Sequence, residues 1–145
     1  MRTSRAGIEL IKKFEGLRLI AYQCSAGVWT IGYGSTRGVK KGMSITDSEA
    51  SKRLIEDLAI AEQSVSSLIK ITLKQNQFDA LVCFVFNIGK TQFAESTLLK
   101  LVNEGKFKEA SEQFARWNKE RRNGELVPSA GLTRRRKAEA ELFST

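Results

Sequence analysis

The sequence predicts an α+β fold, with a small β-sheet near the N-terminus followed by a mainly helical body. Five of the 11 glycines lie between residues 17 and 42, around short runs of strand-forming residues. From residue 46 onward, apolar residues instead recur at the helical period. A chain of 145 residues, 41% of them hydrophobic, fits one domain, or one domain with a small lobe.

The first helix is predicted to begin at Thr3 or Ser4, because either side chain can cap a helix N-terminus. Apolar residues then follow near the helical period up to Phe14, and Gly16 marks the end of the helix. Strands are expected at residues 19–22 and 28–31, with a turn at residues 25–27 between them. These segments predict a twisted sheet of two or three strands.

A long helix of about 22 residues is predicted from Thr46, because Thr46 and Glu49 have the spacing of a capping box. This helix would link a small lobe to a larger one. Residues 75–87 are apolar on most faces, which predicts the central buried helix. The remaining elements expected are helices at about 96–104 and 106–117 with Gly105 between them, a polar loop carrying Gly124 and Pro128, and a last helix at about 133–143.

Lys and Arg outnumber Asp and Glu by 24 to 16, and the net charge of +8 favours a polyanionic partner. Nucleic acid, an anionic membrane and a cell wall all meet that description, and composition leaves the three open. The chain contains no His, which excludes the usual Ser-His-Asp and Cys-His catalytic groups and the commonest metal ligand. Two cysteines are too few for a disulfide framework or a zinc site, so we expect no metal and no cofactor.

The densest group of unusual features lies between residues 14 and 36, where the first helix gives way to the sheet. Glu15 stands at that junction, Cys24 follows after eight intervening residues, and Thr30 follows after five more. A carboxyl group held half-buried in a cleft can donate a proton, because burial favours its neutral form. The alternative is that Glu15 is an ordinary exposed acid at a helix end, and the residues alone leave both interpretations open.

The order Glu-x8-Cys-x5-Thr, within the wording EGLRL…AY…GVWTIGYG, resembles the active-site region of the phage lysozymes of the T-even and lambdoid kind, glycoside hydrolase family 24. Four further segments resemble the same family in the same order. They are GMSIT from Gly42, NQFDAL…FNIG from Asn76, STLL from Ser96, and GLTRRR…EAELF from Gly131. The resemblance therefore covers nearly the whole chain.

The resemblance implies a lysozyme-like fold with a small lobe at about residues 15–50, a connecting helix at about 46–68, and a helical lobe at about 70–145 that includes the N-terminal helix. Substrate would lie in the groove between the lobes. The implied activity is inverting hydrolysis of the β-1,4 bond between N-acetylmuramic acid and N-acetylglucosamine in peptidoglycan, which requires room for a water molecule. Glu15 would be the general acid, and Cys24 and Thr30 would position the attacking water.

The sequence departs from the usual pattern of that family at two positions. Most members have Asp where this chain has Cys24, and a thiol is mostly protonated at neutral pH, so Cys24 is either a catalytic thiol or a tolerated small residue in a turn. Many relatives have His where this chain has Ser35, and we expect its loss to weaken the small lobe more than catalysis. Cys83 lies in the most apolar helix and is expected to be a buried, inert thiol, with a Cys24–Cys83 disulfide as a further hypothesis.

The resemblance also implies residues that line the cleft. Arg135, from the basic run at residues 134–137, would point into the cleft and pair with Glu15; the alternatives are a solvated helix start or a phosphate-binding run. Asn87 would lie near the sugars or cap its helix, and Tyr22 would contact Glu15 or pack. The two tryptophans, Trp29 and Trp117, are either sugar-stacking or core residues.

By resemblance, the chain acts on peptidoglycan glycan strands in host-cell lysis. A monomer is the default expectation, and no nucleic acid is expected as a partner, because the basic run is short and no recognition motif accompanies it. No stretch of about 18 apolar residues predicts a membrane span, and residues 1–13 lack the apolar run of a signal peptide. We therefore expect synthesis in the host cytoplasm without signal peptide or anchor, and dependence on a separate holin-type membrane protein for release to the wall. The alternatives are a lytic transglycosylase, a cationic wall-binding protein without activity, and a nucleic-acid-binding protein.

Overall fold

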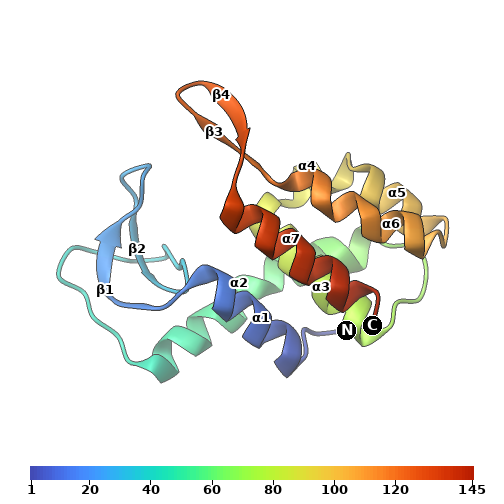
Figure 1. Cartoon of the computed structure of the whole chain (residues 1–145). Helices are drawn as coiled ribbons and strands as arrows, with labels where there is room; N and C mark the ends of the chain where they lie inside the picture. Colours follow the sequence, from blue (N-terminus) through green and yellow to red (C-terminus); the bar gives the residue numbers. More distant parts are fainter.

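A small β-sheet at one end of the molecule is joined by a long helix to a body of packed helices (Figure 1). The structure is a computed structural model and describes residues 1–145. In chain order the elements are α1 (Arg5–Glu15), β1 (Arg18–Gln23), β2 (Trp29–Gly32), α2 (Asp47–Leu68), α3 (Gln75–Ile88), α4 (Lys90–Ala94), α5 (Thr97–Asn103), α6 (Phe107–Gln113), the 3-10 helix η1 (Phe114–Trp117), β3 (Lys119–Arg122), β4 (Glu125–Pro128) and α7 (Ala130–Phe143). The α+β prediction is confirmed.

The small lobe is built on the antiparallel pair of β1 and β2, in which Tyr22 lies opposite Thr30. A single bridge between Ile20 and Ser44 brings the loop before α2 against the other edge of β1, so the sheet is two-stranded with one added bridge. The lobe has its own small core, formed by Ile31, Ile45 and Ala50. Because this core is small, the lobe depends on contacts with α2 to hold its place.

Arg53 of α2 makes one of these contacts. Its Nη1 donates a hydrogen bond to the Oγ of buried Ser35 at 3.1 Å and another to the carbonyl oxygen of Arg37 at 2.9 Å. Ser35 is the position at which the sequence departs from the His of many relatives. The hydroxyl found there is thus hydrogen-bonded to the connecting helix.

The capping box at the start of α2 is confirmed. The Oγ1 of Thr46 accepts a hydrogen bond from the backbone N–H of Glu49 at 3.1 Å, and the Oε1 of Glu49 accepts one from the backbone N–H of Thr46 at 3.2 Å. The helix then runs for 22 residues, as predicted. Its inward stripe includes Leu54, Leu58 and Val65, each at most 1% exposed.

The helical lobe is packed around α3, in which nine residues are buried. Phe84 lies at the centre, with the rings of Phe93, Phe114 and Trp117 against it edge-on at centroid distances of 6.3, 5.3 and 5.8 Å. Edge-to-face pairs of this kind are the favoured arrangement of aromatic rings. The prediction of a central buried helix at residues 75–87 is confirmed.

The segment between residues 106 and 133 differs from the prediction. The helix expected at 106–117 ends at Gln113 and continues as the 3-10 turn η1. The expected polar loop is a two-stranded hairpin, β3–β4, that stands away from the body (Figure 1). The last helix begins at Ala130 instead of Thr133, because the Oγ of Ser129 caps it by accepting a hydrogen bond from the N–H of Leu132 at 3.1 Å. The short helix α4 was not predicted.

The two ends of the chain lie side by side at the base of α3 (Figure 1). Gln75 donates a hydrogen bond from Nε2 to the carbonyl oxygen of Arg2 at 2.8 Å. The next residue, Asn76, donates from Nδ2 to the carbonyl oxygens of Leu142 and Phe143 at 3.0 and 3.1 Å. The side chains of Gln75 and Asn76 at the start of α3 therefore hydrogen-bond to the two ends of the chain. None of the helices combines the length and the apolar character needed to cross a membrane.

Candidate active site

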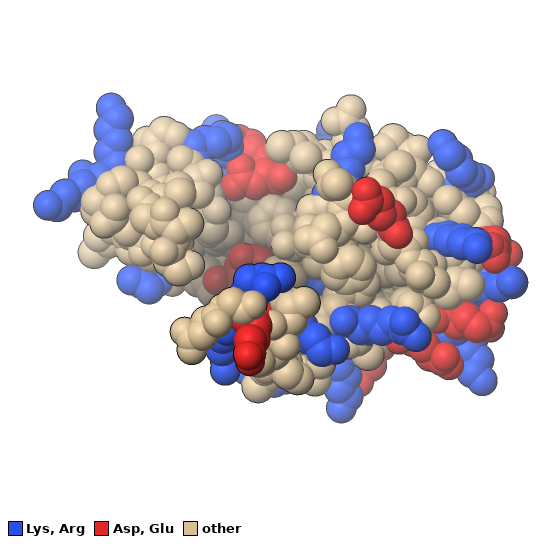
Figure 2. Space-filling model, turned by 90° about the horizontal axis from the view of Figure 1, so that it is seen from above, with Lys and Arg blue, Asp and Glu red and all other residues tan.

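Glu15 is the last residue of α1, at the point where the helical lobe passes into the small lobe. Gly16 ends the helix with a positive φ of 73°, which glycine adopts without strain, and so directs the chain into β1. The Glu15 side chain is 21% exposed and lines a groove of about 490 Å³ with Phe14, Asn87 and Arg135. Figure 2 shows the surface hollowed between the two lobes, with acidic side chains in the hollow. The predicted half-buried carboxyl group is present.

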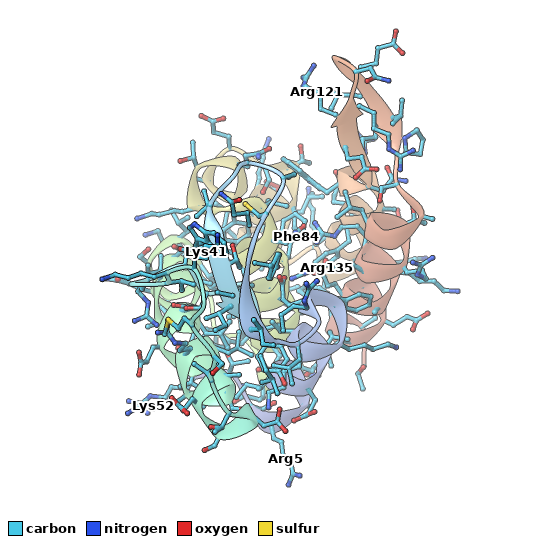
Figure 3. All side chains as sticks on the ribbon, turned by 90° about the vertical axis from the view of Figure 1, so that its left-hand side faces the viewer. Arg5, Lys41, Lys52, Phe84, Arg121 and Arg135 are labelled. Atoms are coloured by element: carbon cyan, nitrogen blue, oxygen red, sulfur yellow. The ribbon has the colours of Figure 1, made fainter.

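Arg135 reaches Glu15 from α7, as the resemblance implied. Its Nη1 lies 2.6 Å from the Oε2 of Glu15, its Nη2 donates to the carbonyl oxygen of Cys83 at 3.0 Å, and its Nε donates to the Oε2 of Glu139 at 3.2 Å. The side chain is only 5% exposed, and it lies inside the molecule while Arg5, Lys52 and Arg121 project outward (Figure 3). Three fixed contacts leave the guanidinium one orientation, so Arg135 fixes the position of the Glu15 carboxylate.

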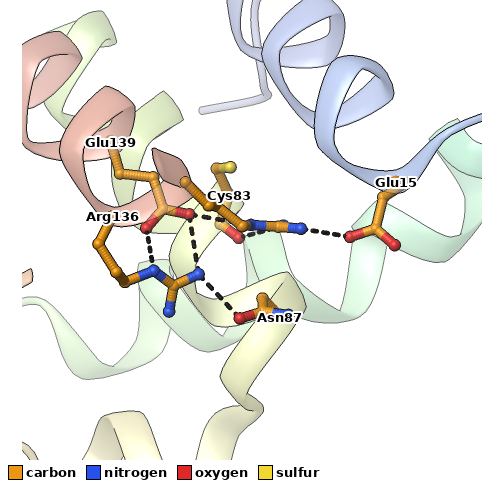
Figure 4. Close-up of polar contacts among 6 residues, drawn as sticks. Glu15, Cys83, Asn87, Arg136 and Glu139 are labelled. Carbon is orange, nitrogen blue, oxygen red and sulfur yellow. Dashed lines mark hydrogen bonds and ion pairs between the residues drawn. The ribbon is translucent and has the colours of Figure 1, made fainter. Parts of the chain in front are cut away.

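Two further charged residues of α7, Arg136 and Glu139, lie behind this pair (Figure 4). The Nε of Arg136 lies 2.8 Å from the Oε1 of Glu139, in ion-pair contact but outside hydrogen-bond geometry. Its Nη2 donates to the Oε2 of Glu139 at 3.2 Å and to the Oδ1 of Asn87 at 2.8 Å. Both side chains are at most 1% exposed. Sequence reasoning missed them, although the i+3 and i+4 spacing from Arg136 and Arg135 to Glu139 was a readable signal.

Burial is the largest influence on the pKa values of Glu139 and Cys83, which lie behind Glu15 and Arg135. It raises the pKa of Glu139 above its ordinary value, while the charges of Arg136 and Arg135 act in the opposite direction. Burial also raises the pKa of the Cys83 thiol well above its ordinary value. Cys83 is fully buried and unpaired with Cys24. The prediction that Cys83 is buried is confirmed, its inertness stays a prediction, and the hypothesis of a disulfide is not supported.

Cys24 and Thr30 lie together in the hairpin of the small lobe. Two backbone hydrogen bonds close the turn. The N–H of Cys24 donates to the carbonyl oxygen of Val28 at 2.9 Å, and the N–H of Gly27 donates to the carbonyl oxygen of Cys24 at 2.8 Å. Hydrogen bonding by the backbone of Val28 and then of Ala26 lowers the pKa of the Cys24 thiol, with a smaller contribution from the Thr30 side chain. The Oγ1 of Thr30 donates to the carbonyl oxygen of Val28 at 2.9 Å, which leaves its lone pairs as acceptors. The loop therefore makes Cys24 a stronger acid than an ordinary thiol.

We expect iodoacetamide to alkylate Cys24 in the native protein with a pH midpoint below that of an ordinary thiol, because the turn stabilises the thiolate. Cys83 should stay unmodified until the protein is unfolded, because it is buried and its pKa is raised. Peptide mass spectrometry of samples alkylated from pH 5 to 10 gives both results. Cys83→Ala is the control for assignment. A midpoint for Cys24 at or above that of an unfolded control peptide would contradict the prediction.

The other expected cleft residues have different surroundings. Asn87 is exposed in the groove, and Gly89, not Asn87, caps α3, so the alternative of a capping role is wrong. Tyr22 packs beneath the guanidinium of Arg18, 4.4 Å from the ring centroid, and makes no hydrogen bond to Glu15. Trp117 both packs on Phe84 and lines a second groove. No cluster of three or more Cys, Asp or Glu side chains is arranged to hold a metal ion.

The second groove, of about 650 Å³, continues the first along the helical lobe, because Asn87 and Leu132 line both. It passes between the end of α3, the start of α5 and the β3–β4 hairpin. Its walls carry Gln92, Glu95, Gln113, Arg116, Trp117, Lys119 and Leu126. A continuous trough with polar and aromatic walls is suited to an extended, hydrogen-bonding polymer such as a glycan.

Comparison with known proteins identifies the family of the chain. Residues 12–139 match the family model described as Phage lysozyme. The chain is 48% identical over 145 residues to the endolysin of Acyrthosiphon pisum secondary endosymbiont phage 1, covering 100% of this chain and 99% of that protein. It is 40% identical over 149 residues to the endolysin of Salmonella phage P22, covering 99% of each.

A solved structure shares the fold. The muramidase domain of SpmX from Asticaccaulis excentricus superposes with a TM-score of 0.95 at 45% identity, covering 99% of this chain and 98% of that one. The lysozyme-like architecture expected from the sequence is therefore confirmed, as is hydrolase activity of the lysozyme type. The chain belongs to the phage lysozyme family.

Proposed function

We propose that the chain is an endolysin of glycoside hydrolase family 24, of the T-even and lambdoid kind, that hydrolyses the β-1,4 bond between N-acetylmuramic acid and N-acetylglucosamine in peptidoglycan. The observation that carries the proposal is the carboxyl group of Glu15, half-buried in a long groove and fixed by Arg135. Full-length likeness to two endolysins and to a muramidase domain supports the choice of substrate.

In this proposal Glu15 is the general acid. It donates its proton to the glycosidic oxygen as the bond from C1 of N-acetylmuramic acid to that oxygen breaks, so that the N-acetylglucosamine side leaves as an alcohol. Glu15 is left as a carboxylate, which Arg135 stabilises.

Cys24 and Thr30 hold the attacking water on the opposite face of the sugar. The water oxygen bonds to C1, inverting its configuration, and one water proton passes to the Cys24 thiolate or through it to solvent. The lowered pKa of Cys24 and its contact with the Thr30 side chain support these roles. Arg136 fixes the Oδ1 of Asn87, so the amide Nδ2 of Asn87 is available to donate to a sugar. Tyr22 lines the small-lobe side of the substrate.

The test is to identify the sugar ends that the purified protein produces from peptidoglycan, using mass spectrometry. Hydrated N-acetylmuramic acid reducing ends are the expected product. Anhydro ends would instead make the protein a lytic transglycosylase, since that reaction adds no water. No cleavage at all, with binding to the wall retained, would leave a cationic wall-binding protein. Proton NMR of the first product anomer separates inversion from retention.

We propose that the whole chain acts as one monomeric catalytic unit, with lobes at about residues 15–50 and 70–145 that both contact the glycan. We also propose that it is made in the host cytoplasm and reaches the wall only through a holin-type membrane protein. A culture that expresses the chain alone should therefore lyse only after a permeabilising agent is added. The net charge of +8 supports attraction to an anionic wall, with binding that weakens as salt rises.

A further inference from the structure

The chemistry described so far uses the hydrogen bond from Arg136 to Asn87 but gives no role to Glu139 or to the pairing of Arg136 with it. Arg136 and Glu139 are at most 1% exposed, and neither lines the two grooves of the active site. Each loses its hydration on folding, and such a buried ion pair is often no more stable than apolar residues of the same volume. Stability alone is therefore a weak reason for their presence.

Their contacts connect them to Glu15 through a single residue. Arg135 bridges two carboxylates, with Nη1 2.6 Å from Glu15 and Nε 3.2 Å from Glu139. Arg136 in turn contacts both oxygens of Glu139, at 2.8 and 3.2 Å. The order of charges from the groove inward is negative, positive, negative, positive (Figure 4). Glu139 thus offsets part of the charge that Arg135 presents to Glu15, and Arg136 offsets part of the charge of Glu139.

We propose that Glu139 and Arg136 are positioning residues that act through Arg135 to set the protonation of the catalytic acid, an inference that rests on the proposed role of Glu15. When Glu15 is ionised, the two positive charges of Arg135 and Arg136 balance the two negative charges of Glu15 and Glu139. When Glu15 gains a proton, the cluster carries one surplus positive charge. Glu139 limits the cost of that state, because without it Arg135 and Arg136 would both be uncompensated and would hold Glu15 as a carboxylate.

The other charged groups near this cluster do not supply the same effect. Lys13 and Arg134 line the groove of Glu15 but are exposed, so water screens them. From α3, the group that faces Glu139 is the thiol of Cys83, which is neutral because its pKa is raised. On the small-lobe side, the backbone at Gly34 approaches Glu15, since a Cβ there would lie 3.5 Å from Oε1, and it brings no charge.

The proposal makes opposite predictions for two adjacent, equally buried residues. Glu139→Gln removes a negative charge, so Glu15 should lose its proton at lower pH, and the limb of the kcat/KM profile that reports Glu15 should move down by about 1 pH unit. Arg136→Gln removes a positive charge, so the same limb should move up by about 1 pH unit. The double variant keeps the balance of charge and should return the limb towards its original place.

The measurement is kcat/KM on soluble peptidoglycan fragments from pH 4 to 9 at constant ionic strength, with the melting temperature of each variant. Asp79→Asn is the matched control, because Asp79 is a buried carboxylate on α3 that accepts hydrogen bonds from Ser4 and Gln75 and from no residue of this cluster. It should lower the melting temperature and leave the limb unmoved. The Arg136→Gln variant also loses the hydrogen bond to Asn87, which should lower kcat/KM at every pH without moving the limb.

The outcomes separate this inference from the proposed function. Parallel losses at every pH, or shifts of the same sign in both single variants, would show a purely structural role and overturn the inference. If Glu139→Gln does not fold, Arg136→Gln and the double variant still test the sign. Activity retained by Glu15→Gln would overturn the proposed function itself, whereas an inactive Glu15→Gln with an unmoved limb in the other variants would overturn only the inference.

Discussion

Glu15→Gln is expected to lower kcat about 1,000-fold while leaving KM nearly unchanged. The amide has almost the shape of the carboxyl group but has no proton to give to the glycosidic oxygen, and general acid catalysis contributes roughly 100- to 10,000-fold. In the proposed function the glycan contacts residues along both grooves, and those contacts do not depend on that proton. The initial rate of release of reducing ends over a range of substrate concentrations measures both constants.

Glu9→Gln is the matched control for this variant. Glu9 lies on the same helix, is 61% exposed, and its only ion-pair contact is to Lys12 at 3.9 Å. Its neutralisation should leave kcat within about twofold, because an exposed pair contributes little. A Glu15→Gln enzyme with more than a tenth of the original kcat would show that another group donates the proton.

Arg135→Met is expected to lower the free energy of unfolding by about 3–5 kcal/mol and to abolish activity. The substitution keeps an apolar stem of similar length but leaves Glu139 buried with only Arg136, and removes the hydrogen bond to the carbonyl of Cys83. Removing one partner of a buried ion pair costs about this much, because the other charge is left uncompensated. Urea unfolding at pH 7 measures the change.

Arg135→Lys should restore little of the loss. A single ammonium group cannot reach Glu15, Glu139 and the Cys83 carbonyl from three sides as the planar guanidinium does. The exposed neighbour Arg134 provides the control, since Arg134→Met should change the free energy of unfolding by less than about 0.5 kcal/mol. An Arg135→Met protein as stable as Arg134→Met would mean that the cluster contributes nothing to folding.

The elements that could be predicted from the sequence are those with a local signal. The capping box fixed the start of α2 at Thr46, and Gly16 marked the end of α1, because both depend on neighbours in the chain. The hairpin β3–β4 was missed because its strands carry charged residues and a proline in place of alternating apolar ones. Its turn at Asn123–Gly124, where both residues have positive φ, was the signal that could have revealed it.

The sequence predicted a residue of the candidate site only where that residue belongs to a motif of the family that the chain resembles. Glu15, Cys24, Thr30 and Arg135 came from the resemblance, and the contact of Arg135 with Glu15 joins residues 120 positions apart. Arg136 and Glu139 were missed because α7 is polar on average, and a polar helix is normally solvated. What buries them is the packing of α7 against α3, which no local pattern encodes.

The contact between α7 and α1 has a consequence for the order of events during synthesis. Because a chain leaves the ribosome N-terminus first, α1 with Glu15 emerges well before α7 with Arg135. Until α7 emerges, Glu15 has no Arg135 beside it, and α3 lacks the helix that packs on it. The charge pair of the candidate site is therefore one of the last contacts that the growing chain can make.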